Sequence, residues 1–340
     1  MVMHGGGAPP SYNAHVADPL RVYHDPLVFR HGTGAFHPER PERVAAVVAA
    51  LGAAGFPALR PASPERTLAS LALVHEAAYV ERVREAAALG PEGSDAPFTL
   101  FDSADNPMSR ATFDAAVRST GLLLAGLDDV LAGKARRGFV VTRPPGHHAR
   151  AVEAMGFCFF NAVAVAARDA RRRYGLDRVL VADFDVHHGN GTQETFWDDG
   201  SVAYLSVHRY PFYPGTGGRE ETGSGAGLGL TVNVPLPAGS GDGAYAGGFS
   251  AALESLGRRF RPELVLVSAG FDAHHRDPLG GMRVSAEGFA IMTRALAALA
   301  DEAAGGRLVS ILEGGYDPVG TAEGATAHAR VLAESVEPSN

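Results

Sequence analysis

The sequence has little of what marks secreted, membrane or nucleic-acid-binding proteins. It contains one cysteine, Cys158, which excludes an intrachain disulfide and suits a reducing compartment. No run of about 18 apolar residues could span a bilayer, and residues 1–15 lack the basic and apolar regions of a signal peptide. Thirty Lys and Arg face 38 Asp and Glu, a formal charge of -8 that argues against a nucleic-acid partner. We therefore expect a cytoplasmic, globular protein with neither a membrane nor a nucleic acid as partner.

Hydrophobic residues make up 46% of the 340 residues, enough to bury a large core. Residues 1–18, rich in Gly, Pro and His, are expected to be a disordered lead, and residues 19–338 to form one domain. Apolar runs predict strands at 138–142, 178–186, 202–208, 230–236, 264–270 and 307–315. Helices are predicted at 109–133, 161–175, 244–260 and 285–303, with Ser109 and Ser285 as N-caps and Gly133 and Gly175 as ends. The glycine-rich stretch 214–229 is expected to be a long surface loop. Apolar strands joined by helices indicate an α/β fold with a parallel sheet covered on both faces.

Polar clusters follow four of these strands. They are RPPGHH (143–148), HHGNGTQ (187–193), FDAHHRDPLG (271–280) and EGGYDP (313–318). Ligands of open parallel sheets bind outside the carboxyl ends of the strands. Four such clusters at one edge predict a concave site able to hold a metal.

The cluster after 178–186 places Asp183, Asp185 and His187 at every second position. Along a strand, alternate side chains point to the same face. Burying two adjacent carboxylates is costly unless a cation lies between them, whereas a strand end in solvent carries acids at little cost. Asp185 and His187, with Asp272 after another apolar strand, make a set of three metal ligands with a fourth position open. The alternative for Asp272 is a helix N-cap.

A metal with two carboxylate ligands acidifies its water less than one held by histidines alone, so the site needs a separate base. The adjacent His147 and His148 are the candidates, because the prolines and glycine before them make a rigid loop. Histidine pairs also occur on surfaces, and we expect that of the second pair, His274–His275. Tyr316, after two glycines, is either a site residue or an ordinary half-buried tyrosine.

The segments RPPGHHA, DFDVHHGNGTQ, SAGFDAHHRDPLG and LEGGY resemble the motifs of the zinc-dependent histone deacetylase superfamily. This superfamily includes acetylpolyamine amidohydrolases and bacterial histone deacetylase-like amidohydrolases. HPERPERV and FYPGTG extend the resemblance over residues 21–335, and Asn190, where class I relatives carry aspartate, resembles class II. The resemblance implies a single-domain, three-layer α/β/α arginase/deacetylase fold with a mostly parallel central sheet. It also implies hydrolysis of an N-acyl amine, such as acetyl-lysine, by metal-activated water with a histidine general base.

The resemblance further implies a role for each matching residue. The zinc ligands would be Asp185, His187 and Asp272. His148 would be the general base, His147 its electrostatic partner and Tyr316 the group that polarises the acyl carbonyl. Asp183 would hydrogen-bond His147, and Asn190 would hydrogen-bond His148. Because a neutral amide supports an imidazolium less than a carboxylate does, His148 should rest neutral.

Two further sets of residues match the family. A structural potassium ion would be bound by Asp183, Asp185, His187, Ser206 and Val207. The substrate would be bound by Gly156, Phe157, Tyr213, Leu279 and the rim residue Asp105. Tyr213 replaces the phenylalanine of many relatives. Leu279 stands where relatives selective for acetylpolyamines carry an acid, which favours an acyl-lysine substrate here.

Other functions stay open at this point. An acetylpolyamine amidohydrolase would use the same site on a charged amine. An arginase-like ureohydrolase would need further His and Asp ligands for a second metal, and a non-catalytic acyl-lysine reader would have lost part of the catalytic set. Fe(II) or Co(II) fits the same ligands as zinc, and a homo-oligomer is compatible with the sequence.

Overall fold

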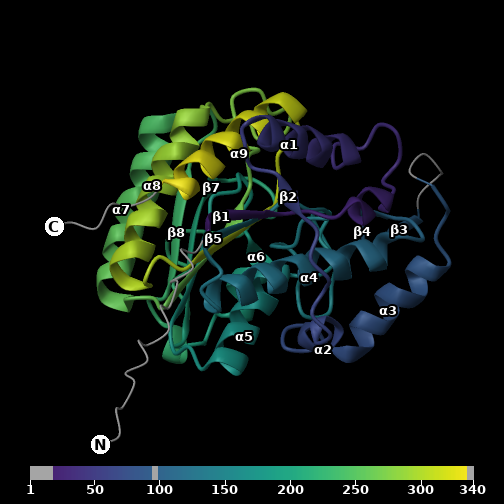
Figure 1. Cartoon of the computed structure of the whole chain (residues 1–340), viewed down its shortest axis with the longest axis horizontal. Coiled ribbons are helices and arrows are strands. Elements are labelled where there is room, and N and C mark those ends of the chain that lie inside the picture. The colour runs from purple at the N-terminus through teal and green to yellow at the C-terminus, as the bar shows by residue number, and fades with distance from the viewer. Residues whose placement is uncertain (1–17, 94–98, 335–340) are drawn as a thin grey trace, which may run out of the picture.

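The computed structural model of the protein describes residues 18–93 and 99–334. Its centre is an eight-stranded sheet in which every pair of neighbouring strands is parallel (Figure 1). The strands lie in the order β2 (Ala58–Leu59), β1 (Asp18–Tyr23), β5 (Ala135–Val140), β10 (Leu308–Leu312), β9 (Leu264–Ala269), β6 (Val179–Asp183), β7 (Val202–Arg209) and β8 (Thr231–Leu236). An antiparallel pair, β3 (Thr99–Phe101) and β4 (Ser103–Met108), lies apart from it. The predicted parallel sheet is confirmed.

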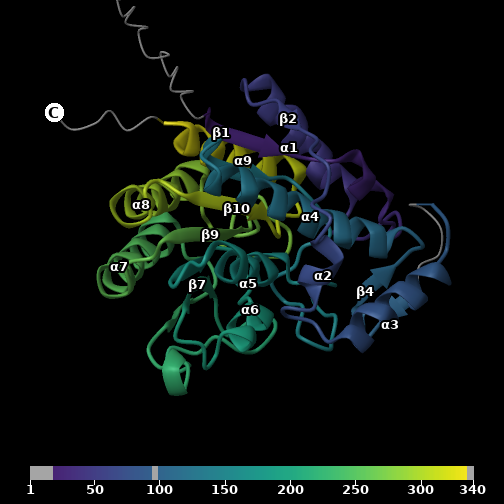
Figure 2. The ribbon, with the colours of Figure 1, turned by 60° about the horizontal axis from the view of Figure 1, so that its bottom comes forward.

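Helices cover both faces of the sheet, as the apolar strands require. Side chains of β6 alternate between two separate cores: Leu180 and Ala182 belong to one, Val179 and Val181 to the other. The first core is closed by α1 (Pro41–Ala53), α7 (Asp242–Phe260), α8 (Ala286–Ala303) and α9 (Pro318–Ala333), and the second by α4 (Thr112–Leu131) and α5 (Ala162–Tyr174). Figure 2 shows the strands between these two groups of helices.

The shorter elements lie around this three-layer body. Both views place α2 (Thr67–Leu71) and α3 (Ala77–Ala88) at the end that also holds β3 and β4. The 3₁₀ turns η1 (Pro26–Arg30) and η2 (Gly225–Gly227) and the short α6 (Asn190–Thr195) complete the elements. No helix in residues 18–93 and 99–334 has the length and apolarity needed to cross a bilayer.

Capping residues explain where several helices begin and end. Ser285 caps α8 by accepting a hydrogen bond from the Gly288 N–H at 3.3 Å, and α5 ends at Gly175 in the left-handed region, at φ 68°, both as predicted. The prediction for Ser109 is wrong. Helix α4 begins at Thr112, and the Ser109 hydroxyl instead accepts from the Gly32 N–H at 2.8 Å, so it is engaged elsewhere.

The strand predicted over 178–186 is too long, because β6 ends at Asp183. Beyond that point side chains replace the strand ladder as hydrogen-bond acceptors: Asp183 Oδ1 accepts from the Asp185 N–H at 3.1 Å, and Asp185 Oδ1 accepts from the His187 N–H at 2.9 Å. Short polar side chains that bond the backbone two residues on turn the chain out of a strand. Residues 1–17 of the predicted lead and 335–338 of the predicted domain lie outside the described residues, and Asp18 opens β1.

Candidate active site and metal site

Three buried side chains meet beyond the carboxyl ends of β6 and β9. One ligand atom each of Asp185, His187 and Asp272 lies within 4.8 Å of the others. His187 Nδ1 is 3.1 Å from Asp185 Oδ1 and 3.1 Å from Asp272 Oδ2. The other carboxylate oxygens are fixed by backbone donors, Gly314 N–H to Asp185 Oδ2 and Val186 N–H to Asp272 Oδ1, each at 2.7 Å. Two carboxylates and one imidazole facing one another can hold a divalent metal ion.

The charges of this group require a positive partner. Burial and the Asp185 carboxylate raise the pKa of Asp272 to about 7. Burial alone would lower the pKa of His187, but its hydrogen bonds with Asp185 and Asp272 raise it to about 9. The imidazole thus holds a proton where the carboxylates concentrate negative charge, and a metal cation answers the same need. Of the two readings of this segment, the buried one applies, because Asp183 and Asp185 have no exposed surface.

His147 forms a buried pair with Asp183. Its Nδ1 lies 2.9 Å from Asp183 Oδ2, which also accepts a hydrogen bond from the Tyr204 hydroxyl at 3.1 Å. Burial alone would lower the pKa of His147, yet the charges of Asp183 and Asp185 raise it to about 10. His147 is therefore an imidazolium at neutral pH.

His148 is the opposite case. Burial, followed by the positive charges of His147 and His187, holds the pKa of His148 well below its usual range. Its Nδ1 lies 2.8 Å from the Asn190 Oδ1, while the Asn190 amide nitrogen faces the Met155 sulfur at 3.3 Å. With the amide oxygen toward the ring, Nδ1 donates and Nε2 is the nitrogen that can accept a proton. The neighbouring histidines thus have different protonation states, which suits one base and one cation.

The backbone beside His148 requires glycine. Gly156 has φ 57°, and a Cβ added there would lie 2.3 Å from His148 Cδ2. The Gly156 N–H donates to Asp105 Oδ2 at 3.2 Å, which ties the site to β4. Phe157 follows at φ 67°. The positive φ values and the absence of a side chain let this segment pass directly beside the imidazole.

Tyr316 lies on the other side of the site and is almost fully buried. Its N–H donates to Asp277 Oδ2 at 2.7 Å, and the Arg43 guanidinium lies 4.8 Å from its ring centroid. Burial raises the pKa of Tyr316, so its hydroxyl stays protonated and can donate a hydrogen bond. Arg43 is itself buried in an ion pair with Glu39 at 2.9 Å.

Aromatic rings surround the metal-capable group. Tyr213 meets His148 edge-on, with ring centroids 5.2 Å apart, and Phe157 meets Tyr316 at 5.8 Å. Burial and the neighbouring Asp105 carboxylate raise the pKa of Tyr213. Leu279 is 36% exposed, and its N–H donates to Asp277 Oδ1 at 2.9 Å. Asp277 therefore connects the backbones of Leu279 and Tyr316.

A second set of oxygen atoms lies beneath the site. Asp183 on β6 is the register partner of Ser206 on β7. The Tyr245 hydroxyl is within 3.0–3.1 Å of three carbonyl oxygens, those of Phe184, Asp185 and Val207. A hydroxyl donates one hydrogen, so buried electron pairs remain on these carbonyls.

The structure brings together residues that the sequence interpretation did not name. Asp277 and Glu313 lie within motifs quoted above, and their position directly after a strand was the available signal. Phe212 stacks on His187, with ring centroids 5.2 Å apart and planes at 17°. The expectation that both members of His274–His275 lie on the surface is wrong for His274, which is buried beneath the first turn of α9, where a Cβ on Gly320 would lie 2.5 Å from its Nδ1.

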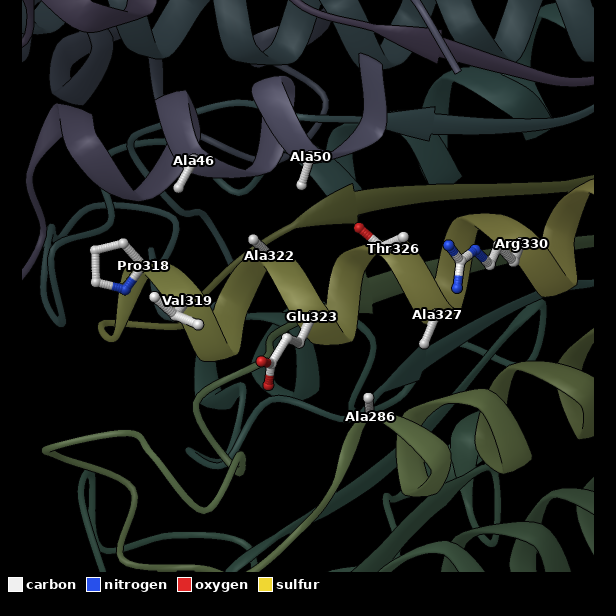
Figure 3. A pocket seen from close by; sticks show the side chains of 10 residues that line it. All are labelled: Ala46, Ala50, Ala286, Pro318, Val319, Ala322, Glu323, Thr326, Ala327 and Arg330. Carbon is white, nitrogen blue, oxygen red and sulfur yellow. The ribbon is translucent and has the colours of Figure 1, made fainter. Parts of the chain in front are cut away.

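An apolar pocket of about 500 Å³ lies elsewhere, between α1 and α9 and beside the start of α8 (Figure 3). Figure 3 shows Ala46 and Ala50 of α1 above it and Ala322 and Thr326 of α9 along its length. None of its lining residues is among those predicted from the sequence to form the site.

Comparison with known proteins agrees with the geometry. The model of the histone deacetylase domain family matches residues 37–332, and the chain belongs to this family. It is 41% identical over 303 residues to Histone deacetylase 15 of Arabidopsis thaliana, covering 87% of this chain and 52% of the relative. It is 42% identical over 306 residues to Polyamine deacetylase HDAC10 of Homo sapiens, covering 88% of this chain and 43% of the relative.

A bacterial relative matches over more of its own length. The Histone deacetylase-like amidohydrolase of Pseudomonas aeruginosa is 40% identical over 286 residues, which are 83% of this chain and 73% of the relative. The crystal structure of the HDA15 HD domain superposes with a TM-score of 0.85 at 38% identity, covering 92% of this chain and 89% of that one. The expected three-layer deacetylase fold is thus confirmed. The chain spans about half the length of several relatives that it matches.

Proposed function

We propose that the protein is a zinc-dependent deacetylase that hydrolyses the amide of an N-acylated amine such as acetyl-lysine. The observation that carries this proposal is the meeting of a buried Asp–His–Asp group with a neutral histidine, an imidazolium and a buried tyrosine hydroxyl. Zn²⁺ held by Asp185, His187 and Asp272 would supply Lewis acidity and lower the pKa of water. Fe(II) or Co(II) suits the same ligands.

The protein's own residues divide the remaining work. Nε2 of His148 takes the proton of the attacking water and later gives it to the nitrogen of the breaking C–N bond, so that amine and carboxylate leave. The His147 imidazolium, held by Asp183, stabilises the negative charge that develops as water adds. The Tyr316 hydroxyl donates to the acyl oxygen where that charge forms. Asn190 fixes the tautomer of His148 without supplying a charge.

The surroundings favour an extended, uncharged alkyl segment such as a lysine side chain. Phe157 and Tyr213 would form the walls against its methylenes, and Gly156 leaves room beside His148. Asp105 would hold the substrate backbone at the rim. Leu279 offers apolar contact and no charge, so it contributes no Coulombic preference for a polyamine. An acetylpolyamine remains the second candidate substrate, because a relative named as a polyamine deacetylase is 42% identical.

We further propose a structural potassium ion held by Asp183, Asp185, His187, Ser206 and Val207. The carbonyls gathered around the Tyr245 hydroxyl support it, because they leave buried oxygen electron pairs that a monovalent cation would satisfy. Localisation in the cytoplasm fits the single buried cysteine, Cys158. A peptide or small-molecule N-acyl amine is the expected partner, and a homo-oligomer stays an open expectation.

The test is a kinetic panel on the zinc-loaded protein, comparing kcat/KM for an acetyl-lysine peptide and for N8-acetylspermidine. We expect the peptide to be preferred and Leu279→Glu to move the preference toward the polyamine, because the new carboxylate attracts its secondary ammonium. A wild type that prefers the polyamine by more than about tenfold, a ratio worth about 1.4 kcal/mol, would contradict the acyl-lysine assignment. Absence of turnover on both substrates would contradict the deacetylase proposal itself.

A further inference from the structure

Glu313 is a buried carboxylate that the proposed chemistry leaves unused. It follows β10 directly and is 1% exposed. The other fully buried glutamate, Glu39, forms ion pairs with Arg43 and Arg143. Within residues 18–93 and 99–334, no lysine or arginine side chain forms an ion pair with the Glu313 carboxylate. A buried carboxylate without such a partner is costly, so its environment calls for an explanation.

The partners of Glu313 are the backbone of the loop that carries His147 and His148. Its Oε2 accepts from the Gly146 N–H at 2.6 Å and lies 3.3 Å from the His147 nitrogen, while Oε1 accepts from the Ser268 hydroxyl at 3.0 Å. Pro144 and Pro145 have no N–H, so these are the first two donors that the loop offers after Arg143. Successive backbone N–H groups aimed at one carboxylate oxygen form an anion-binding concavity.

The opposite side of the loop is also closed. A Cβ added to Gly146 would lie 2.7 Å from the Phe160 carbonyl oxygen and 3.1 Å from the Ala162 nitrogen. The loop is therefore held between the Glu313 carboxylate and this backbone. Removing the carboxylate would leave two buried N–H groups unpaired, and the loop could recover them only by moving.

Charge adds to this geometry. Burial raises the pKa of Glu313 to about 7, while His147 and the Gly146 N–H favour the ionised form. Glutamine could accept from the same N–H groups, so hydrogen bonding alone does not require a charge here. The ionisable groups around the loop are Asp183 and Asp185 after β6, His148 in the loop, Tyr204 on β7, Cys158, and Arg43 of α1, which donates to the Glu313 carbonyl oxygen.

We propose that Glu313 is a positioning residue, whose carboxylate sets the place of the His147–His148 loop and whose negative charge favours the protonated form of His147. The proposal rests on the proposed function for the roles of the two histidines. The loop contacts themselves belong to the structure.

The test compares Glu313→Gln and Glu313→Ala with the wild type in the zinc-loaded full-length protein. The first reading is the amide proton shift of Gly146 by NMR, which needs no activity. A short bond to a carboxylate moves this proton downfield, so we expect an upfield shift in Glu313→Gln and a larger one in Glu313→Ala. The second reading is the protonation of the His147 ring from its nitrogen shifts between pH 6 and 10, which should be lost at lower pH in Glu313→Gln.

Kinetics provide the third reading. Glu313→Ala should lower kcat at least about tenfold with KM within about twofold, and Glu313→Gln should recover at least about fivefold of that loss, magnitudes expected for displaced catalytic groups. Both variants should keep one zinc per chain. Glu302→Gln, on the exposed side of α8, is the matched loss of one negative charge and should change none of the readings.

An unshifted Gly146 amide, an unshifted His147 titration, wild-type kcat in Glu313→Ala or loss of zinc from Glu313→Gln would each overturn the proposal. If Glu313→Ala does not fold, the two NMR readings on Glu313→Gln decide it alone. A wild type without turnover on either substrate would instead contradict the proposed function, while the amide shift would still test the position of the loop.

Discussion

Replacing Asn190 by aspartate tests how the site keeps His148 neutral. The Asn190 amide oxygen lies 2.8 Å from His148 Nδ1, so the substitution places a negative charge in hydrogen-bond contact without changing side-chain size. Two unit charges 4 Å apart at an effective dielectric constant of about 20 interact by about 4 kcal/mol, or about three pKa units at most. A carboxylate beside a cation shifts a pKa by about 1–3 units. We expect the pKa of His148 to rise by that amount.

The consequence is a displaced pH profile. His148 acts as a base only when neutral, and activity is lost as pH falls through its pKa. A raised pKa therefore moves the acid limb of kcat/KM upward by about 1–3 pH units in Asn190→Asp. At pH 7 the variant should be impaired, and at pH 9 it should regain much of the wild-type rate.

The assay is kcat/KM for an acetyl-lysine peptide from pH 5 to 9.5, with metal content measured at each end. Asn190→Ala is the control, because it removes the hydrogen bond without adding a charge, and it should lose activity without an upward shift of the acid limb. If the acid limb of Asn190→Asp stays where the wild-type limb lies, the base is not His148 or its charge is not governed by position 190.

The other predictions concern the metal, the acyl oxygen and the buried histidines. Asp185→Ala or Asp272→Ala should lose both bound zinc and activity, and full zinc occupancy by elemental analysis in either variant would contradict the ligand assignment. Tyr316→Phe should keep its zinc and lose about 10²–10³ in kcat, the usual loss for one oxyanion donor; an unchanged kcat would remove Tyr316 from that role. Burial lowers the pKa of His328 to about 3, so the unfolded chain binds one more proton than the folded protein below about pH 6.5. The free energy of unfolding should therefore fall with pH between about 6.5 and 3, by up to about 1.4 kcal/mol per unit for this residue. Urea unfolding at pH 7, 6 and 5 should show a shallower fall in His328→Gln, and an equal slope would refute the assignment.

The layered fold could be predicted because its signals are local. An apolar strand such as 264–270 needs cover on both sides, and a helix such as α8 carries its own start signal in Ser285. Because all neighbouring strands of the sheet are parallel, their carboxyl ends share one edge, so the polar clusters after them had to meet there. The sequence thus determined the sheet, the edge and the types of residue at the site.

Other features depended on partners distant in the sequence. Strand β6 stops at Asp183 because Asp183 and Asp185 bond the backbone ahead of them, although the apolar pattern continues. Ser109 faces Gly32 rather than its own helix, and His274 is buried because α9 packs over it. In each case a contact made after folding overrode a valid local preference.

The protonation states were decided by the tertiary structure alone. His147 and His148 are adjacent and equal in sequence, yet one faces Asp183 and is positive while the other faces Asn190 and is neutral. Glu313 shows the same dependence, since its role comes from two backbone N–H groups about 170 residues earlier in the chain. Side-chain pKa values follow burial and neighbouring charges within a few ångströms, and those distances exist only once the strands are side by side.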